Sequence, residues 1–188
     1  MYITSDMLAG FESHYGQPQE ITACFGMKYD EFFNLQASQK NGRMHDITFF
    51  IRKENLWIVN SKPWYPIGLY RIPSGGAKPN ESIEDGTKRE AWEETGCEID
   101  LVRYFLRIAV QFRCDDQKVD WISHLVLADW KAGVPHPIDT KEIKEAKFAS
   151  QEDFDYFGRI MLALDVGGLH YREFLHRKAF EILDQLDI

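Results

Sequence analysis

The sequence contains little cysteine and no long hydrophobic run. Its three cysteines, Cys24, Cys97 and Cys114, are odd in number and include no C-x-x-C pair, which argues against a disulfide framework or a zinc site. The longest apolar runs, such as residues 47–51, are far too short to cross a bilayer. No basic segment followed by an apolar stretch opens the sequence, so we expect a cytoplasmic protein that does not span a membrane.

Basic residues are also in the minority. Lysine and arginine number 22 against 30 aspartate and glutamate residues, which gives a formal net charge of −8. No basic cluster stands out, so the sequence lacks the electrostatic footprint of a protein that binds duplex nucleic acid. An acidic protein can still bind phosphate groups if a divalent cation lies between the two, because the cation offsets both negative charges.

The length of 188 residues suits one domain with an extension. We divide the chain into an N-terminal extension, residues 1–45, and a main domain, residues 46–188, that ends in helices. Within the extension, the residue pattern predicts short helices over residues 7–15 and 28–40. The aromatic residues of the extension would pack either on the main domain or on a second subunit, so a homodimer is one expectation.

The main domain alternates strand and helix patterns. Residues 47–52 and 56–60 are rich in β-branched and aromatic residues around a polar turn, which predicts a hairpin. Residues 81–95 predict a helix with a capping box at Ser82 and a C-terminal glycine at Gly96. Further strands are expected over residues 69–72, 98–112, 119–130 and 143–149, and further helices over residues 154–164 and 171–186. This pattern predicts an α/β (α+β) fold with a mixed sheet between helices.

The predicted helix over residues 81–95 carries a cluster of acids. Glu90, Glu93 and Glu94 lie at i, i+3 and i+4, so they share one helix face and repel one another. A solvated acidic face is the simpler interpretation of such a triplet taken alone. A hard divalent cation with oxygen ligands would resolve the repulsion, since Arg89 is the only adjacent base.

The surroundings of the acid cluster favour the metal interpretation. Ser74, Gly75 and Gly76 form a turn of small residues that lets the backbone approach a ligand closely. Glu81 lies eight residues before Arg89, so its carboxylate can fold back onto the guanidinium. Gly86 interrupts the helix at a cost of about 1 kcal/mol relative to alanine, and a close approach to a neighbouring strand would explain it.

The whole segment from Gly75 to Cys97 resembles the Nudix box, G-x5-E-x7-R-E-U-x-E-E-x-G-U, where U is a bulky apolar residue. Small Ala91 and Cys97 stand at the two apolar positions, a mild departure that leaves the polar positions intact. Seven such identities arise by chance in fewer than about one in a million chains of this length. The identities are Gly75, Glu81, Arg89, Glu90, Glu93, Glu94 and Gly96.

The resemblance implies a Nudix-type mixed sheet sandwiched between helices and a hydrolase of nucleoside diphosphates linked to another group. It implies magnesium as the cofactor, with manganese as a substitute. By position, Glu90, Glu93 and Glu94 would be metal ligands, with Glu94 and Glu90 the strongest candidates. Arg89 with Glu81 would orient these ligands, and the backbone of Gly75 and Gly76 would shape the loop around the metal site.

The general base of such an enzyme often lies outside the box, near the last strand. The acidic stretch over residues 139–148 resembles that region, and Glu142 is our first candidate there, with Glu145 second. Either side chain could instead be a solvated charge at the strand edge.

Contacts to a small nucleotide-like substrate are harder to assign. Trp64, Tyr65, Phe112 and Trp121 could stack on a nucleobase, although aromatic residues more often belong to the core. Arg71 and Arg113 could contact phosphate.

Several alternatives stay open beside the small-nucleotide hydrolase. One is a module that binds and senses a nucleotide without cleaving it, and another is a pyrophosphohydrolase of RNA 5′ ends. The acidic balance argues against RNA, because a basic groove usually binds it. The S-Q-P-W-P-F-P segment of NADH-cleaving members is missing from the sequence. A structural protein with an accidental acidic helix is the remaining alternative.

Overall fold

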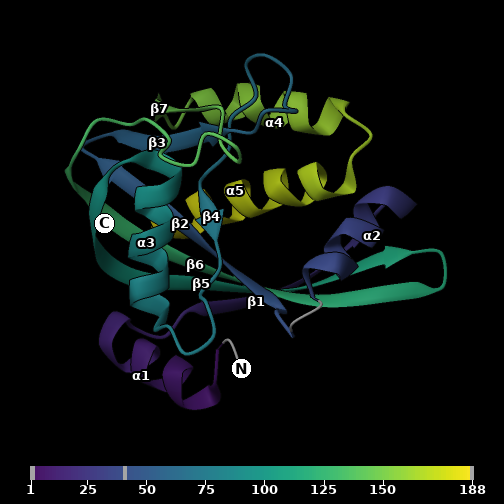
Figure 1. The fold of residues 1–188 in the computed structure, drawn as a ribbon, viewed down its shortest axis with the longest axis horizontal. Coiled ribbons are helices and arrows are strands. Elements are labelled where there is room, and N and C mark those ends of the chain that lie inside the picture. Colours follow the sequence, from purple (N-terminus) through teal and green to yellow (C-terminus); the bar gives the residue numbers. More distant parts are fainter. Residues whose placement is uncertain (1–2, 40–41, 187–188) are drawn as a thin grey trace.

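A mixed β-sheet forms the centre of the protein (Figure 1). The computed structural model describes residues 3–39 and 42–186. Within these residues the strands follow the order β1-β5-β6-β2-β3-β7, and β4 pairs with β2 beside this path. Their bounds are β1 (Gln19–Gly26), β2 (His45–Lys53), β3 (Leu56–Ser61), β4 (Ser74–Gly75), β5 (Glu98–Cys114), β6 (Gln117–Ala132) and β7 (Glu145–Ser150).

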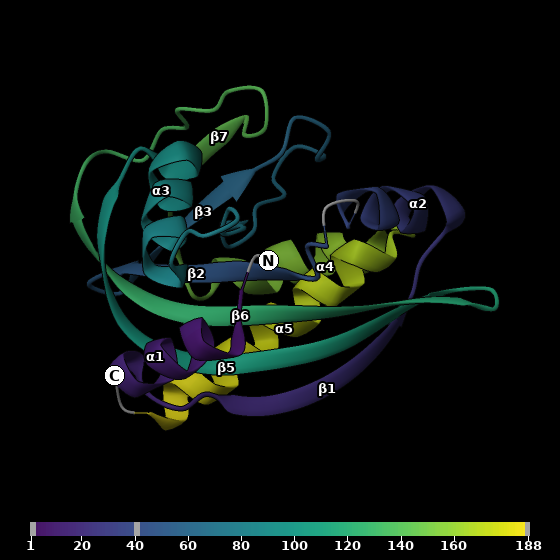
Figure 2. The same ribbon diagram turned by 60° about the horizontal axis from the view of Figure 1, so that its bottom comes forward.

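Helices cover both faces of this sheet (Figure 2). Helices α1 and α3 pack on one face, where Phe11 of α1 meets Tyr104 of β5 at a ring distance of 5.4 Å. Helices α2, α4 and α5 lie on the other face, which holds the larger apolar cluster. The bounds are α1 (Ser5–Tyr15), α2 (Tyr29–Ser38), α3 (Ile83–Thr95), α4 (Asp153–Ala163) and α5 (Gly167–Gln185). The predicted mixed sheet between helices is therefore confirmed.

The long hairpin of β5 and β6 connects the two halves of the sheet. The strands are antiparallel from Glu98 opposite Ala132 to Cys114 opposite Gln117, with irregular register near Leu101 and Tyr104. Strand β1 pairs parallel to β5, and β2 pairs parallel to β6. The predicted hairpin over residues 47–60 is present, since β2 and β3 pair antiparallel through Arg52 and Trp57.

The N-terminal segment contributes a strand that the sequence analysis did not predict. Residues 19–26, between the two predicted helices, form the edge strand β1, although Gly16, Pro18 and Gly26 punctuate this part of the sequence. The alternation in β1 places Ile21, Ala23 and Phe25 against the apolar cluster under α5. The two predicted helices of this segment are present as α1 and α2, and Lys40, the last residue predicted for the second, lies outside the described residues.

A predicted strand over residues 69–72 does not form. This stretch has only an isolated bridge between Asn60 and Arg71, and the next strand, β4, begins at Ser74. No helix in the described part of the chain is both long enough and apolar enough to cross a membrane.

Candidate active site

The loop after β4 and helix α3 form one unit on one face of the sheet (Figure 1). The predicted capping box is present, since the Ser82 hydroxyl accepts a hydrogen bond from the Asp85 amide at 3.0 Å. Gly96 ends the helix with φ at 64°, a left-handed conformation that favours glycine. Gly86 lies against Ala77 of the loop, where an added Cβ would meet the Ala77 Cα at 3.0 Å, so a loop rather than a strand explains this glycine.

Arg89 connects the loop to the helix. Its Nε and Nη2 donate to the two oxygens of Glu81 at 2.8 and 2.9 Å, which is the fork geometry of a strong charged pair. Its Nη2 also donates to the Gly76 carbonyl at 2.9 Å, and its Nη1 donates to Glu90 and Glu93 at 3.0 Å each. The predicted pairing of Glu81 with Arg89 is therefore confirmed.

Glu90 lies against the glycine turn. Its Oε1 accepts a hydrogen bond from the Gly76 amide at 3.2 Å. A Cβ atom at Gly75 would overlap the Glu90 carboxyl group, and one at Gly76 would lie 2.6 Å from the Arg43 guanidinium carbon. Both glycines are thus required because the loop backbone packs directly on charged side chains.

Glu94 is the most buried acid of the site, with 2% of its side chain exposed. Its Oε2 accepts hydrogen bonds from Asn60 Nδ2 at 2.6 Å and from the Ser74 amide at 3.1 Å. Lys62 Nζ and Arg71 Nη2 lie 3.7 and 3.8 Å from its Oε1. Burial raises the pKa of Glu94, and the two nearby cations oppose this shift while the charge of Glu90 adds to it.

The three acids of the box are not equivalent. Glu90 and Glu94 face the loop, whereas Glu93 is 40% exposed and shares Arg89 Nη1 with Glu90. Among the described residues, no group of three His, Cys, Asp or Glu side chains is gathered closely enough to hold a metal ion.

Glu90 and Glu94 still fit a hard divalent cation. The glycine turn brings backbone against the Glu90 carboxylate, whose other contact is the Arg89 guanidinium. Asn60 Oδ1, buried beside Glu94, has no hydrogen-bond partner in the described structure. Carboxylate and carbonyl oxygens are the ligand types that magnesium prefers.

Lys62 is a residue of this site that the sequence analysis missed. Its ammonium lies 3.7 Å from Glu94 and 3.6 Å from Glu142, so it connects the acid of α3 to our first candidate base. Burial and the nearby Arg71 lower the pKa of Lys62. Glu145, the second candidate, instead accepts a hydrogen bond from the Tyr70 hydroxyl at 2.7 Å. No local pattern marks Lys62, because β3 brings it to the site only through the fold.

Asp46 and Arg172 form a second missed pair, close to the carboxylates. Arg172 of α5 donates to Asp46 at 2.9 Å and to the Ser74 hydroxyl at 3.0 Å. Asp46 also accepts from the Trp121 indole at 3.0 Å and from the Ser123 hydroxyl at 2.5 Å. Burial raises the pKa of Asp46, but Arg172 and these donors hold it below its usual value.

The structure separates the four aromatic candidates for base stacking. Phe112 is buried in the core, where its ring packs on that of Tyr171 at 5.2 Å. Tyr65 is 8% exposed, and its ring meets Trp64 edge-on at 4.5 Å. Trp64 is 66% exposed.

The two arginines expected to contact phosphate lie apart. Arg71 lies beside Glu94, and Arg113 donates to Gln111 at 2.7 Å on the exposed part of β5.

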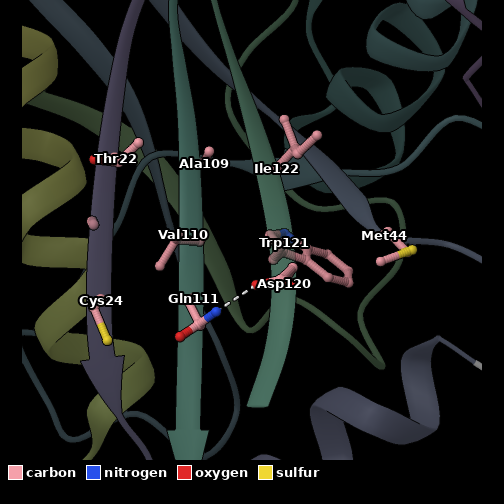
Figure 3. A pocket seen from close by; sticks show the side chains of 10 residues that line it. Thr22, Cys24, Met44, Ala109, Val110, Gln111, Asp120, Trp121 and Ile122 are labelled. Atoms are coloured by element: carbon pink, nitrogen blue, oxygen red, sulfur yellow. Dashed lines mark hydrogen bonds between the residues drawn. The ribbon is translucent and has the colours of Figure 1, made fainter.

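Trp121 borders a hollow on β1, β5 and β6 (Figure 3). Its ring extends from β6 toward Met44, and Gln111 donates to Asp120 at 2.9 Å nearby. Among the described residues that line the hollow, none is Lys or Arg, and most are apolar or neutral. Such a lining offers no counter-charge to a phosphate group, so the hollow is a poor phosphate site.

The Glu81–Arg89 pair makes a testable contribution to stability. Arg89 holds the pKa of Glu81 at about 2, below its ordinary 4.5, so its stabilisation is complete above pH 4.5 and is lost as the pH falls toward 2. We expect Glu81→Gln to cost about 2 kcal/mol of unfolding free energy at pH 7 and clearly less at pH 3.

Urea denaturation at both pH values measures this difference. Glu98→Gln is the control, since Glu98 is exposed at the start of β5. An equal cost of Glu81→Gln at both pH values would contradict the assigned pairing.

Comparison with known proteins agrees with this geometry. The family model of the NUDIX domain matches residues 42–166. The NAD-capped RNA hydrolase NudC of Vibrio parahaemolyticus is 36% identical over 98 residues, which cover 52% of this chain and 35% of that protein. NudC of Photobacterium profundum is 29% identical over 99 residues, 53% of this chain and 35% of that protein. The match thus spans about a third of these relatives.

A solved structure is similar in fold. A NUDIX-family hydrolase from Clostridium perfringens superimposes with a TM-score of 0.51 at 19% identity, and the match covers 77% of this chain and 99% of that one. Members of this family generally use divalent metal ions. The match to the family model extends over more than half of the chain and includes the whole segment from Gly75 to Cys97. This chain therefore belongs to the Nudix family.

Proposed function

We propose that the protein is a metal-dependent hydrolase that cleaves a phosphate anhydride in a nucleoside diphosphate-linked substrate. The observation that carries the proposal is the pair of Glu90 and Glu94 beside the glycine turn, where Arg89 holds Glu90 and both Asn60 and the Ser74 amide hold Glu94. Magnesium, or manganese in its place, would supply charge neutralisation on the phosphates and activation of the attacking water. In this proposal the site binds a small molecule rather than duplex nucleic acid, and the enzyme acts in the cytoplasm.

The residues divide into ligands and positioning groups. Glu90 and Glu94 would hold the metal, and Glu93, the more exposed acid, would join them through its oxygen that does not contact Arg89. Arg89 and Glu81 position these acids and keep the Gly75–Gly76 backbone in place. Such supporting contacts typically change metal affinity or activity by about 10- to 100-fold.

Two cations beside Glu94 would bind the phosphates of the substrate. Lys62 and Arg71 lie within 4 Å of Glu94 and carry positive charge into a buried region. Phosphate oxygens are their natural partners, since each cation would then offset a negative charge. The protein thus combines acids for the metal with a few bases for the phosphates, despite its net charge of −8.

Hydrolysis at the 5′ end of RNA is a second candidate function. The matched relatives are named NAD-capped RNA hydrolases, which favours a dinucleotide-like group as the substrate. The acidic composition and the missing S-Q-P-W-P-F-P segment weigh against NAD and RNA as the preferred substrates. A third candidate function is binding without cleavage. A protein that only binds a nucleotide would not need the complete set of acids in the box.

Glu94→Gln tests the hydrolase proposal. We expect wild type with magnesium to cleave at least one compound in a panel of nucleotide sugars, ADP-ribose, NAD and NAD-capped RNA, and the variant to be at least about a hundredfold slower. Glu84→Gln on the same helix is the control, because Glu84 pairs with Lys88 at the opposite end of α3. Phosphate or nucleotide release is the readout.

The outcome also separates the alternatives. Cleavage confined to NAD-capped RNA would transfer the proposal to RNA ends. Binding of panel compounds without any cleavage by folded wild type would favour the sensing module, and equal rates in wild type and Glu94→Gln would remove Glu94 from the mechanism.

Glu142 is our proposed general base, because Lys62 brings it into the same ionic network as Glu94. A positioned base contributes about 10²- to 10⁴-fold to rate, so Glu142→Gln should lower kcat by at least about a hundredfold. Glu145→Gln should change kcat little, since Glu145 is engaged with Tyr70. The reverse ranking of the two variants would assign the role to Glu145.

A further inference from the structure

A cavity of about 620 Å³ lies between α2, the start of α5 and the segment that follows β3. Helix α2 lies beside the N-terminal end of α5 in both ribbon views (Figures 1 and 2). Only Trp64, Tyr65 and Val166 of its lining fall within residues 42–166. The other walls come from residues 27–35 and 168–172, so the family model does not describe this cavity.

The cavity reaches the carboxylate site through Arg172. This residue lines the cavity and donates a hydrogen bond to the Ser74 hydroxyl at 3.0 Å. The Ser74 amide donates to Glu94 at 3.1 Å, and Arg71 donates to the same Ser74 hydroxyl at 2.9 Å. A single residue, Ser74, therefore links Arg172 to Glu94. A molecule with its phosphates near Glu94 would have its remainder directed toward the cavity.

The walls suit a flat ring. Trp64 exposes 66% of its surface, although a large indole is costly to leave in water. Its ring is fixed edge-on against Tyr65 at 4.5 Å, which limits its motion. Met27, Leu35 and Leu169 add apolar surface to the same lining. An aromatic side chain held beside apolar neighbours is a stacking platform for a base, since every base has a π-face.

The charges of the walls give the ligand a direction. Arg172 lines the cavity and shares the Ser74 hydroxyl with Arg71 of the carboxylate site, while Asp46 accepts a hydrogen bond from the same guanidinium at 2.9 Å. Asp30 and Glu31 stand on the α2 side, where Glu31 accepts hydrogen bonds from the Gly167 and Gly168 amides. An anionic diphosphate would be repelled by the α2 side and attracted to Arg172, whereas an uncharged base can approach both.

We propose that this cavity binds the nucleobase of the substrate, stacked on Trp64, while Arg172 faces the adjoining phosphate. The inference rests on the proposed hydrolase function for the presence of a nucleotide, but the cavity itself is defined by α2 and α5. It assigns a substrate-binding role to the N-terminal segment, because α2 supplies one wall. The acidic side chains of α2 would also exclude a second anionic group, such as a further phosphate, from the side of the cavity that α2 forms.

Calorimetric binding of product-like compounds tests the cavity without any turnover. The probes are AMP, GMP, CMP and UMP with magnesium, and ribose 5-phosphate serves as the probe without a base. We expect wild type to bind at least one mononucleotide tenfold or more tightly than ribose 5-phosphate. Trp64→Ala should abolish this difference by weakening the mononucleotide while leaving ribose 5-phosphate within about twofold.

A second variant and a matched control protect the test against misfolding. Asn34→Trp adds bulk to the cavity from an exposed position of α2, so it should also weaken the mononucleotide alone. Trp92→Ala removes another exposed tryptophan, 46% accessible on α3 and outside the lining of this cavity, and should change neither affinity. Equal affinity of wild type for all mononucleotides and ribose 5-phosphate would overturn the proposal, as would unchanged base preference in both cavity variants.

The binding test and the hydrolysis test can fail separately. Base preference that depends on Trp64, together with equal hydrolysis by wild type and Glu94→Gln, would leave the cavity assignment standing and remove the proposed mechanism. Hydrolysis that depends on Glu94 without any base preference would do the opposite.

Discussion

The bidentate pair of Glu81 with Arg89 holds the candidate site together. One guanidinium contacts the loop carbonyl of Gly76, the acid at the loop's end and two acids of α3. Without it, Glu90 and Glu93 would repel each other on one helix face, and the glycine turn would lose its attachment to the helix. Glu81 carries the compensating charge, so Arg89 can donate to acids that remain available for a cation.

The distribution of charge follows from this arrangement. Acids gather on α3, while the cations Lys62 and Arg71 lie beside Glu94 and Arg172 is linked to it through Ser74. A metal ion on the acid side and phosphates on the cation side would neutralise both groups at once. The net charge of −8 is therefore compatible with phosphate chemistry, because three of the 22 basic residues lie near Glu94.

The sequence was most informative where function depends on local spacing. The box residues Glu81, Arg89 and Glu90, the cap at Ser82 and the helix end at Gly96 could all be predicted, because their partners lie within one loop and one helix. Lys62, Asp46 and Arg172 could not, since β2, β3 and α5 bring them together only in the folded chain. Strand β1 could not be predicted for the same reason, because its pairing with β5 in the folded sheet makes it a strand.

Manganese binding to wild type and Arg89→Lys, followed by electron paramagnetic resonance of the free ion, tests the central role of Arg89 most directly. A lysine keeps the charge but cannot fork between Glu81 and Gly76, so we predict an affinity at least about tenfold weaker in a protein that circular dichroism shows to be folded. Arg177→Lys, at an exposed arginine of α5, should bind as wild type does. Unchanged manganese affinity in folded Arg89→Lys would contradict the account, because the acids would then be positioned without the guanidinium.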